Sequence, residues 1–251
     1  MKLLLFQYDD RIFNRDDIRQ KLMKHNEDIC KKNNIIYKFS NVSKHDISCY
    51  WIKVFDTYNL LIENQNIDYI IFLDTDACII SSDITNLIDI ITKSNIASCS
   101  MIINDASINN NYFNAGAFIV KNNEIGINIL KKWKSFYNPD KWFKKNGKFV
   151  TLNNKGEREN KKFVTISDLA YEEIPFRNYI LLNEEFSNHI YRVDDTVFNS
   201  IKITEKTVVY HGRSQSMGRN KIYFDNNIFN KFENKEEISN DISNENEKIF
   251  L

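Results

Sequence analysis

The feature that most constrains this chain is an apolar run that ends in two aspartates. Residues 69–73 read YIIFL, the next three are Asp74, Thr75 and Asp76, and a second apolar stretch follows at 77–80. A strand without polar alternation is buried on both faces, and such strands belong to parallel sheets covered by helices. The run therefore predicts a central strand of an α/β fold.

The patterns on either side predict the same class. Their periodicity indicates strands at 2–8 and 35–39 and helices at 16–32 and 46–62, so that strands and helices alternate up to the apolar run. Further on, we expect helices at 87–91, 124–136 and 167–173, strands at 96–101, 112–120, 180–182 and 207–210, and a loop at 138–162. This order predicts a three-layer sandwich with right-handed crossovers and a mainly parallel central sheet.

Length and composition narrow the class further. The chain has 251 residues, which suits one domain at 1–225 with a C-terminal helix or disordered tail at 226–251. Lys plus Arg and Asp plus Glu each number 34, so no overall field favours nucleic acid. No apolar segment is long enough for a signal peptide or a transmembrane segment. The four cysteines lack zinc spacing, and we expect reduced thiols in a cytoplasmic protein.

The two aspartates indicate a metal site. Ligands of open α/β sheets bind beyond the carboxyl ends of the strands. If the backbone stays extended, the side chains of Asp74 and Asp76 point the same way, and two adjacent carboxylates call for a cation between them. Oxygen ligands suit Mn²⁺ or Mg²⁺, which also bind substrate phosphates. The alternative, that one aspartate caps a turn, stays open.

Two other protein classes use related motifs. Haloacid-dehalogenase-type phosphatases carry D-x-D after the first strand with Thr or Val two residues later, whereas this motif follows the third predicted strand and has Cys78 there. Sugar nucleotidylyltransferases carry a glycine-rich loop after the first strand, and residues 7–14 contain no glycine. Both classes are disfavoured, and the second is kept as an alternative.

Three motifs resemble those of GT-A glycosyltransferases: residues 51–53 (WIK), 68–80, and 112–120 (YFNAGAFIV). The pattern is similar to the galactosyl/xylosyltransferase group (family 34) and, more distantly, to glycogenin-like enzymes, over residues 1–215. The resemblance implies a Rossmann-like nucleotide-diphospho-sugar transferase fold.

The resemblance also implies roles for individual residues. It assigns Asp74 and Asp76 to the metal and the donor diphosphate, with Asp76 also counted as catalytic and Thr75 as donor-binding. It places Asn114, Ala115 and Gly116 beside the donor sugar, where a glycine lets the backbone approach a ligand. It matches Lys53 to a donor-contacting cation, for which a solvated helix lysine is the alternative.

The remaining site residues come from the two ends of the predicted domain. His211 ends an apolar strand and is expected to be the third metal ligand, while Gly212 and Arg213 open a loop that can hold phosphate. Asp168 resembles the family's late acidic residue near the reacting sugar, although Leu169 stands where that family has Gln. Tyr8 and Asp10 follow the first strand, where the resemblance places the base and ribose of the donor.

These residues predict a Mn²⁺- or Mg²⁺-dependent glycosyltransferase that moves a sugar from a nucleotide-sugar, with UDP favoured, to a glycan, protein or lipid. Retention of the anomeric configuration follows from the resemblance, but Asp168, Glu172 or Glu173 as a general base would allow inversion. A non-catalytic nucleotide-sugar or glycan binder is the alternative from another class. The absence of an anchor suggests a bacterial, viral or cytosolic enzyme, and the oligomeric state stays open.

Overall fold

The protein is described by a computed structural model that covers residues 1–11, 17–42, 45–81, 84–105, 113–145, 148–151 and 171–212. Of residues 143, 145 and 148–151, only the backbone is described. The chain divides into two compact units, 1–211 and 212–251. The description that follows concerns the first unit and, of the second, only Gly212.

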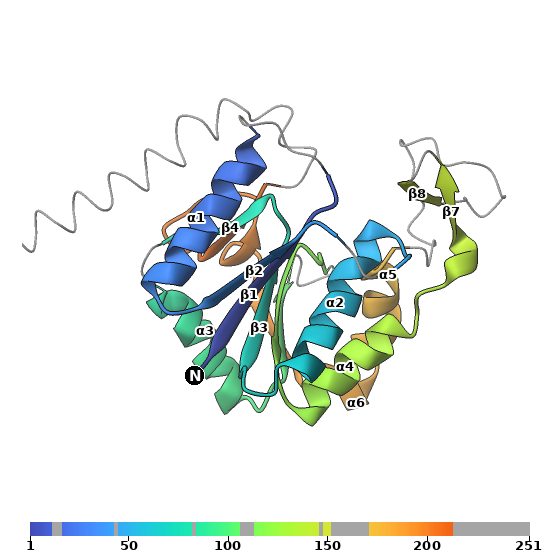
Figure 1. Ribbon diagram of the computed structural model, residues 1–251. Coiled ribbons are helices and arrows are strands. Elements are labelled where there is room, and N and C mark those ends of the chain that lie inside the picture. The colour runs from blue at the N-terminus through green and yellow to red at the C-terminus, as the bar shows by residue number, and fades with distance from the viewer. Residues whose placement is uncertain are drawn as a thin grey trace, which may run out of the picture. The chain divides into compact units, whose positions relative to one another are not determined.

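A six-stranded sheet forms the centre of this unit (Figure 1). Its strands lie in the order β2 (Ile36–Ser40), β1 (Leu3–Tyr8), β3 (Tyr69–Leu73), β6 (Ala117–Lys121), β5 (Met101–Asp105) and β9 (Ile190–Asp194). Strand β6 is antiparallel to both of its neighbours, and every other pair in the sheet is parallel. The predicted mainly parallel sheet is confirmed, with one reversed strand at its middle.

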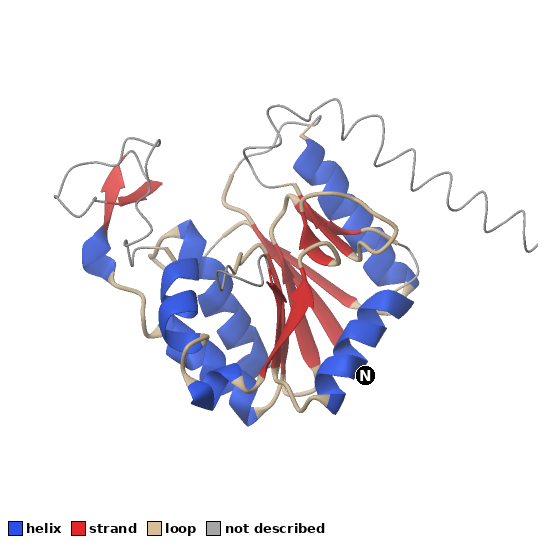
Figure 2. Cartoon of the chain, turned by 180° about the vertical axis from the view of Figure 1, so that it is seen from behind, coloured by secondary structure: helices blue, strands red, loops and turns tan. Residues whose placement is uncertain are grey.

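Helices cover both faces of this sheet (Figure 2). One face is covered by α2 (Cys49–Glu63), α4 (Glu124–Lys134), α5 (Glu173–Pro175), the π-helical turn η2 (Phe176–Ile180) and α6 (Glu184–Ser187). The other is covered by α1 (Ile18–Lys32), α3 (Thr85–Ile96) and a small sheet of β10 (Phe198–Ser200), β11 (Val209–His211) and β4 (Ala77–Ile79). The predicted α/β three-layer sandwich is therefore confirmed.

Strand β3 shows why the chain must fold this way. Ile70 and Phe72 pack in the core beneath α2 and α4, whereas Ile71 and Leu73 pack in the core on the opposite face. All five residues of the strand are buried. Because neither face of β3 can be exposed to water without a large loss of apolar burial, both layers of helices are needed.

Local signals set the start of two of the covering helices. The side chain of Asp17 accepts a hydrogen bond from the backbone N–H of Arg19 at 3.0 Å, and that of Asn123 accepts one from Gly126 at 2.8 Å. Such caps satisfy backbone donors that the first turn leaves unpaired. Gly126 is required by packing, since a Cβ there would lie 2.2 Å from the carbonyl oxygen of Lys121.

Three of the expected elements are placed differently by the structure. Helix α3 is longer than the predicted 87–91, and the strand expected at 96–101 begins only at Met101, after a turn in which Ser98 has φ of 56°. The strand expected at 180–182 is wrong, because η2 and a turn occupy this stretch. Short apolar runs do not distinguish a buried strand from a buried helical turn.

Other elements were not anticipated. Strands β4, β9 and β10 had no predicted counterpart. The range expected to be a loop contains the 3₁₀ turn η1 (Pro139–Lys141) and a hairpin of β7 (Trp142–Lys145) and β8 (Lys148–Thr151), while 152–162 lies outside the described residues. The helix expected at 167–173 lies mostly outside them too, as does the tail at 226–251.

All four cysteines are free thiols, as expected. Burial raises the pKa of Cys30 and of Cys78 to about 12. None of the helices in the described ranges is both long and apolar enough to cross a membrane.

Replacement of Ile71 by alanine tests the two-sided burial of β3. Ile71 is fully buried, and Ile71→Ala is expected to lower the free energy of unfolding by about 2–5 kcal/mol in urea titrations. Ile96→Ala is the matched control, because Ile96 is 81% exposed and its loss should cost less than about 0.5 kcal/mol. Equal losses in the two variants would contradict the assignment of β3 to the centre of the fold.

Candidate functional site

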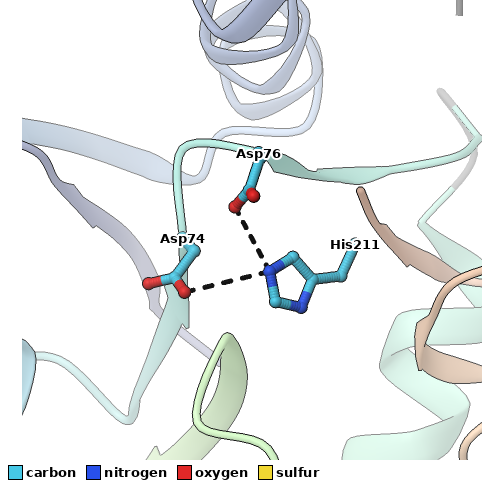
Figure 3. Close-up of side chains that lie close together, drawn as sticks. All are labelled: Asp74, Asp76 and His211. Carbon is cyan, nitrogen blue, oxygen red and sulfur yellow. Dashed lines mark ion pairs between the residues drawn. The ribbon is translucent and has the colours of Figure 1, made fainter. Parts of the chain in front are cut away.

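A tight turn at the end of β3 presents the two aspartates. The backbone N–H of Ala77 donates to the carbonyl of Asp74 at 2.9 Å, so the chain reverses over these residues. The extended backbone expected here is wrong: β4 leaves the central sheet to pair with β11. The turn still directs both carboxylates to one side, as Figure 3 shows.

Two buried amides hold this turn in place. Gln7 on β1 donates to the carbonyl of Asp74 at 3.0 Å. Asn26 on α1 donates to the carbonyl of Ala77 at 2.9 Å and to the side-chain oxygen of Gln7 at 3.2 Å. Both side chains are fully buried, where an unmade hydrogen bond is costly. Neither residue was predicted from the sequence, although a glutamine inside the apolar strand LLLFQY is a visible signal.

His211 reaches the aspartates through the pairing of β4 with β11. These strands are antiparallel, with His211 opposite Ala77, the residue after the motif. Nε2 of His211 lies 3.2 Å from Oδ1 of Asp76 and 3.8 Å from Oδ2 of Asp74 (Figure 3). One ligand atom from each residue lies within 4.8 Å of the others. The three residues expected to bind metal are thus adjacent although far apart in sequence.

The ring of His211 lies directly on Gly116. A Cβ at residue 116 would lie 2.0 Å from Cε1 of the histidine and 2.5 Å from its Nδ1. In addition, the backbone N–H of Asp74 donates to the carbonyl of Gly116 at 2.7 Å. Close packing of protein against protein thus requires the glycine, where the approach of a ligand was expected from the sequence.

Lys53 on α2 is a buried cation at the edge of this group. Its Nζ lies 2.8 Å from Oδ1 of Asp74, 3.4 Å from Oε1 of Glu172 and 3.4 Å from the carbonyl oxygen of Ala115. Burial lowers the Lys53 pKa, but Asp74 and Glu172 raise it by more, so the amine stays charged. The alternative of a solvated helix lysine is excluded, because the residue is 8% exposed.

The chain from Asn114 to Gly116 forms a turn before β6, where the prediction had a continuous strand. Glu173 accepts hydrogen bonds from the side chain of Asn114 at 2.8 Å and from the backbone N–H of Ala115 at 2.9 Å. Asn199, which has φ of 67°, donates to the side chain and the carbonyl of Asn114, both at 3.0 Å. Asn199 was not predicted from the sequence, and Glu173, considered there only as a possible general base, supports this turn.

Carboxylates outnumber cations here. Burial raises the pKa of Asp76, but the adjacent His211 lowers it by more, to about 2. For Glu172, burial prevails over the attraction of Lys53 and raises the pKa to about 8. Asp74 and Asp76 place two carboxylates within 3.8 Å of the same imidazole, an arrangement that can hold a divalent cation.

The first strand contributes a separate ion pair. Arg11 donates from Nε to Oδ1 of Asp9 at 2.7 Å and from Nη2 to Oδ2, and the hydroxyl of Thr75 also donates to Asp9. Asp9 and Thr75 are buried, whereas the side chain of Arg11 is half exposed. The middle residue of the motif therefore connects β3 to the end of β1. Neither Asp9 nor Arg11 was singled out from the sequence.

The other expected site residues are placed as follows. Tyr8 is 9% exposed and packs in the core on the α2 face, while the next residue but one, Asp10, is exposed. Gly212 is buried directly after His211. Asp168 and Arg213 lie outside the described residues. The donor-binding and catalytic roles of these five residues stay predictions.

Comparison with known proteins shows similarity in structure alone. No protein-family model matches the chain, and no curated protein matches its sequence. A glycosyltransferase involved in the glycosylation of the major capsid of PBCV-1 matches with a TM-score of 0.58 and 11% identity, over 90% of this chain and 99% of the other. Together with the sheet order and the reversed β6, this match decides the fold. The chain has the GT-A glycosyltransferase fold.

Weaker matches include mouse xyloside xylosyltransferase 1 in its apo form, with a TM-score of 0.44 and 10% identity over 86% of this chain and 98% of the other. A197 from STIV matches with a TM-score of 0.40 and 13% identity over 77% and 82%. In this fold, Asp74 and Asp76 follow the central strand β3 and meet His211 beyond its end, where ligands of open α/β sheets bind.

A double-mutant cycle tests the packing of His211 on Gly116. Gly116→Ala should markedly lower the free energy of unfolding, because the new methyl group overlaps the imidazole. The same change should cost much less in a His211→Ala background, where the ring is gone. Urea unfolding of the four proteins should give a coupling energy of about 1–3 kcal/mol. Additive losses would contradict the contact.

Proposed function

We propose that this protein is a metal-dependent glycosyltransferase that moves a sugar from a nucleotide-sugar, with a UDP-sugar favoured, to a glycan, protein or lipid acceptor. The observation that carries the proposal is the convergence of Asp74, Asp76 and His211 at the end of β3 in a GT-A fold. The turn formed by Asn114, Ala115 and Gly116 lies against the same histidine, and a donor sugar would lie beside it.

The three converging residues fit a divalent ion. Two carboxylates and an imidazole nitrogen suit Mn²⁺ or Mg²⁺. Adjacent ligands of an octahedral ion with bonds of about 2.1 Å lie about 3 Å apart. The Nε2 of His211 is 3.2 Å from Asp76 and 3.8 Å from Asp74, so small side-chain movements would complete the geometry. When bound, such an ion neutralises the charge that develops on the departing diphosphate.

The remaining residues would orient the donor and compensate charge. Lys53 holds Asp74 by one carboxylate oxygen, Oδ1, while Oδ2 is the one that faces His211. Arg213 and the backbone of Gly212 would contact the phosphates of the donor. Tyr8 and Asp10 would contact its nucleoside. Thr75 would hold the motif in place through its hydrogen bond to Asp9. Asp168 would act beside the reacting sugar. Residues 1–225 would form this catalytic domain.

The transfer itself exchanges one bond for another. The acceptor hydroxyl oxygen bonds to the anomeric carbon of the sugar, and the bond from that carbon to the phosphate oxygen breaks. The nucleoside diphosphate leaves with the electron pair, and the proton of the hydroxyl passes to the departing diphosphate. We favour retention of configuration. Glu172 is buried against Lys53, and Glu173 accepts hydrogen bonds from Asn114 and Ala115, so neither glutamate is a well-placed general base for inversion.

A donor panel tests the proposal. Purified protein incubated with UDP- and GDP-sugars should release nucleoside diphosphate from at least one of them with MnCl₂ and not with EDTA. Asp76→Asn should lower this rate by about 100-fold or more, because charge stabilisation of the leaving group is lost. Asp28→Asn on the exposed face of α1 is the matched control and should retain the wild-type rate.

Three results would contradict the proposal. Failure to bind or cleave any nucleotide-sugar, with or without metal, would exclude a glycosyltransferase. Donor binding without turnover across many acceptors would indicate a non-catalytic binder. Release of pyrophosphate from UTP and a sugar phosphate would identify a nucleotidylyltransferase.

Metal binding can be measured without any substrate. MnCl₂ at 100 times its Kd should add about 2.7 kcal/mol to the free energy of unfolding and raise the Tm accordingly. His211→Ala should abolish this increase, since it removes one of three ligands. His189→Ala should leave the increase unchanged, because His189 is a half-buried histidine that forms a hydrogen bond with the backbone carbonyl of Ser98, away from the site. An equal Tm increase in His211→Ala and wild type would contradict the assignment of the ligand.

A further inference from the structure

Three aromatic side chains from separate segments meet beside the candidate site. Tyr50 stacks on Trp142 with ring centroids 6.0 Å apart, and Tyr171 meets both rings edge-on at 5.0 and 5.6 Å. They come from the first turn of α2, the start of β7 and the segment before α5. We refer to Tyr50, Trp142 and Tyr171 as the aromatic cluster.

The aromatic cluster combines an exposed surface with an unsatisfied polar group. Tyr50 is 46% exposed, although its ring contacts two others. Trp142 is 8% exposed, and its indole N–H has no hydrogen-bond acceptor among the residues that the structure describes. This nitrogen is buried, so a ligand would reach it only if the surrounding rings moved.

Two members of the aromatic cluster are close in sequence to residues of the proposed donor site. Tyr50 lies one helical turn before Lys53, whose amine contacts Asp74 at 2.8 Å. Tyr171 directly precedes Glu172, which contacts the same amine at 3.4 Å. Figure 1 shows α2 and α5 on the same side of the central sheet. A molecule bound to the aromatic cluster would therefore lie beside the residues that surround the donor sugar.

We propose that the aromatic cluster is the acceptor subsite and that it binds a glycan, by stacking the apolar C–H face of a pyranose ring on Tyr50. This inference rests on the proposed function and names the acceptor class that the function left open. Aromatic walls with a few polar groups are typical of small-ligand sites, and tyrosine and tryptophan supply both.

The polar groups of the cluster favour a glycan over a lipid chain. Each ring carries a hydroxyl or an indole N–H, and Lys144 and Asp46 form an ion pair that ties β7 to the segment before α2. An acyl chain would cover these groups without forming hydrogen bonds, which is costly. The hydroxyl groups of a sugar can exchange hydrogen bonds with the hydroxyl groups of the tyrosines.

Binding to defined oligosaccharides tests the proposal. The full chain, saturated with UDP and MnCl₂, is applied to an array of di- to hexasaccharides of glucose, galactose, mannose, xylose and N-acetylglucosamine, and Kd values for the bound glycans are measured by calorimetry. Tyr50→Ala should weaken binding at least tenfold, because it removes the stacking surface. Tyr50→Phe should bind within about threefold of wild type, since it keeps the ring.

Tyr179 provides the matched control. It is also 46% exposed and also stacks on another ring, Phe136 at 5.1 Å, but it lies outside the aromatic cluster. Tyr179→Ala should bind the glycan like wild type. Release of UDP from the donor in water, without glycan, should be the same in wild type and Tyr179→Ala.

Two outcomes would overturn the acceptor subsite. One is that the wild-type protein binds UDP with Mn²⁺ but no glycan on the array. The other is that Tyr50→Ala and wild type bind the same glycan equally well. If the wild-type protein bound neither UDP nor metal, this would instead contradict the proposed function. Glycan binding that depends on Tyr50 would still support the subsite in that case.

Discussion

The packing of the His211 ring on the bare backbone of Gly116 is the contact on which the site depends. It joins the end of β11 to the turn before β6 and leaves Nε2 facing Asp76 and Asp74. Because a Cβ at residue 116 would overlap the ring, the imidazole can occupy this place only against glycine. The pairing of β11 with β4 then sets the height of the histidine relative to the aspartates.

Around this contact, each of two buried charged groups interacts with two other side chains. Lys53 lies between Asp74 and Glu172, and Asp9 lies between Arg11 and Thr75. Removing Lys53 or Arg11 would leave a carboxylate without its cation, which costs far more than an exposed ion pair contributes. The turn with the two aspartates is therefore held from several sides before any ligand binds, and Gln7 and Asn26 fix its backbone.

The fold was predictable to the extent that burial leaves a mark in the sequence. The apolar run of β3, the alternation of strands and helices, and the stripes on α2 and α4 predicted the layers and the sheet type. The strands β4, β9 and β10 were missed because three to five residues carry too weak a periodicity. The strand expected at 180–182 was wrong, since apolar residues that fill a helical turn look the same in sequence as those of a short strand.

By itself, the sequence determined that two aspartates end a buried central strand and that the chain forms an α/β sandwich. Hydrophobic burial and charged residues at strand ends both leave patterns among residues that are close together in the sequence. Only the tertiary structure decided that His211 joins them, that Lys53 is buried against Asp74, and that Glu173 and Asn199 hold the turn at Asn114. These contacts join residues far apart in the chain, and strand pairing and packing, rather than local pattern, bring them within bonding distance.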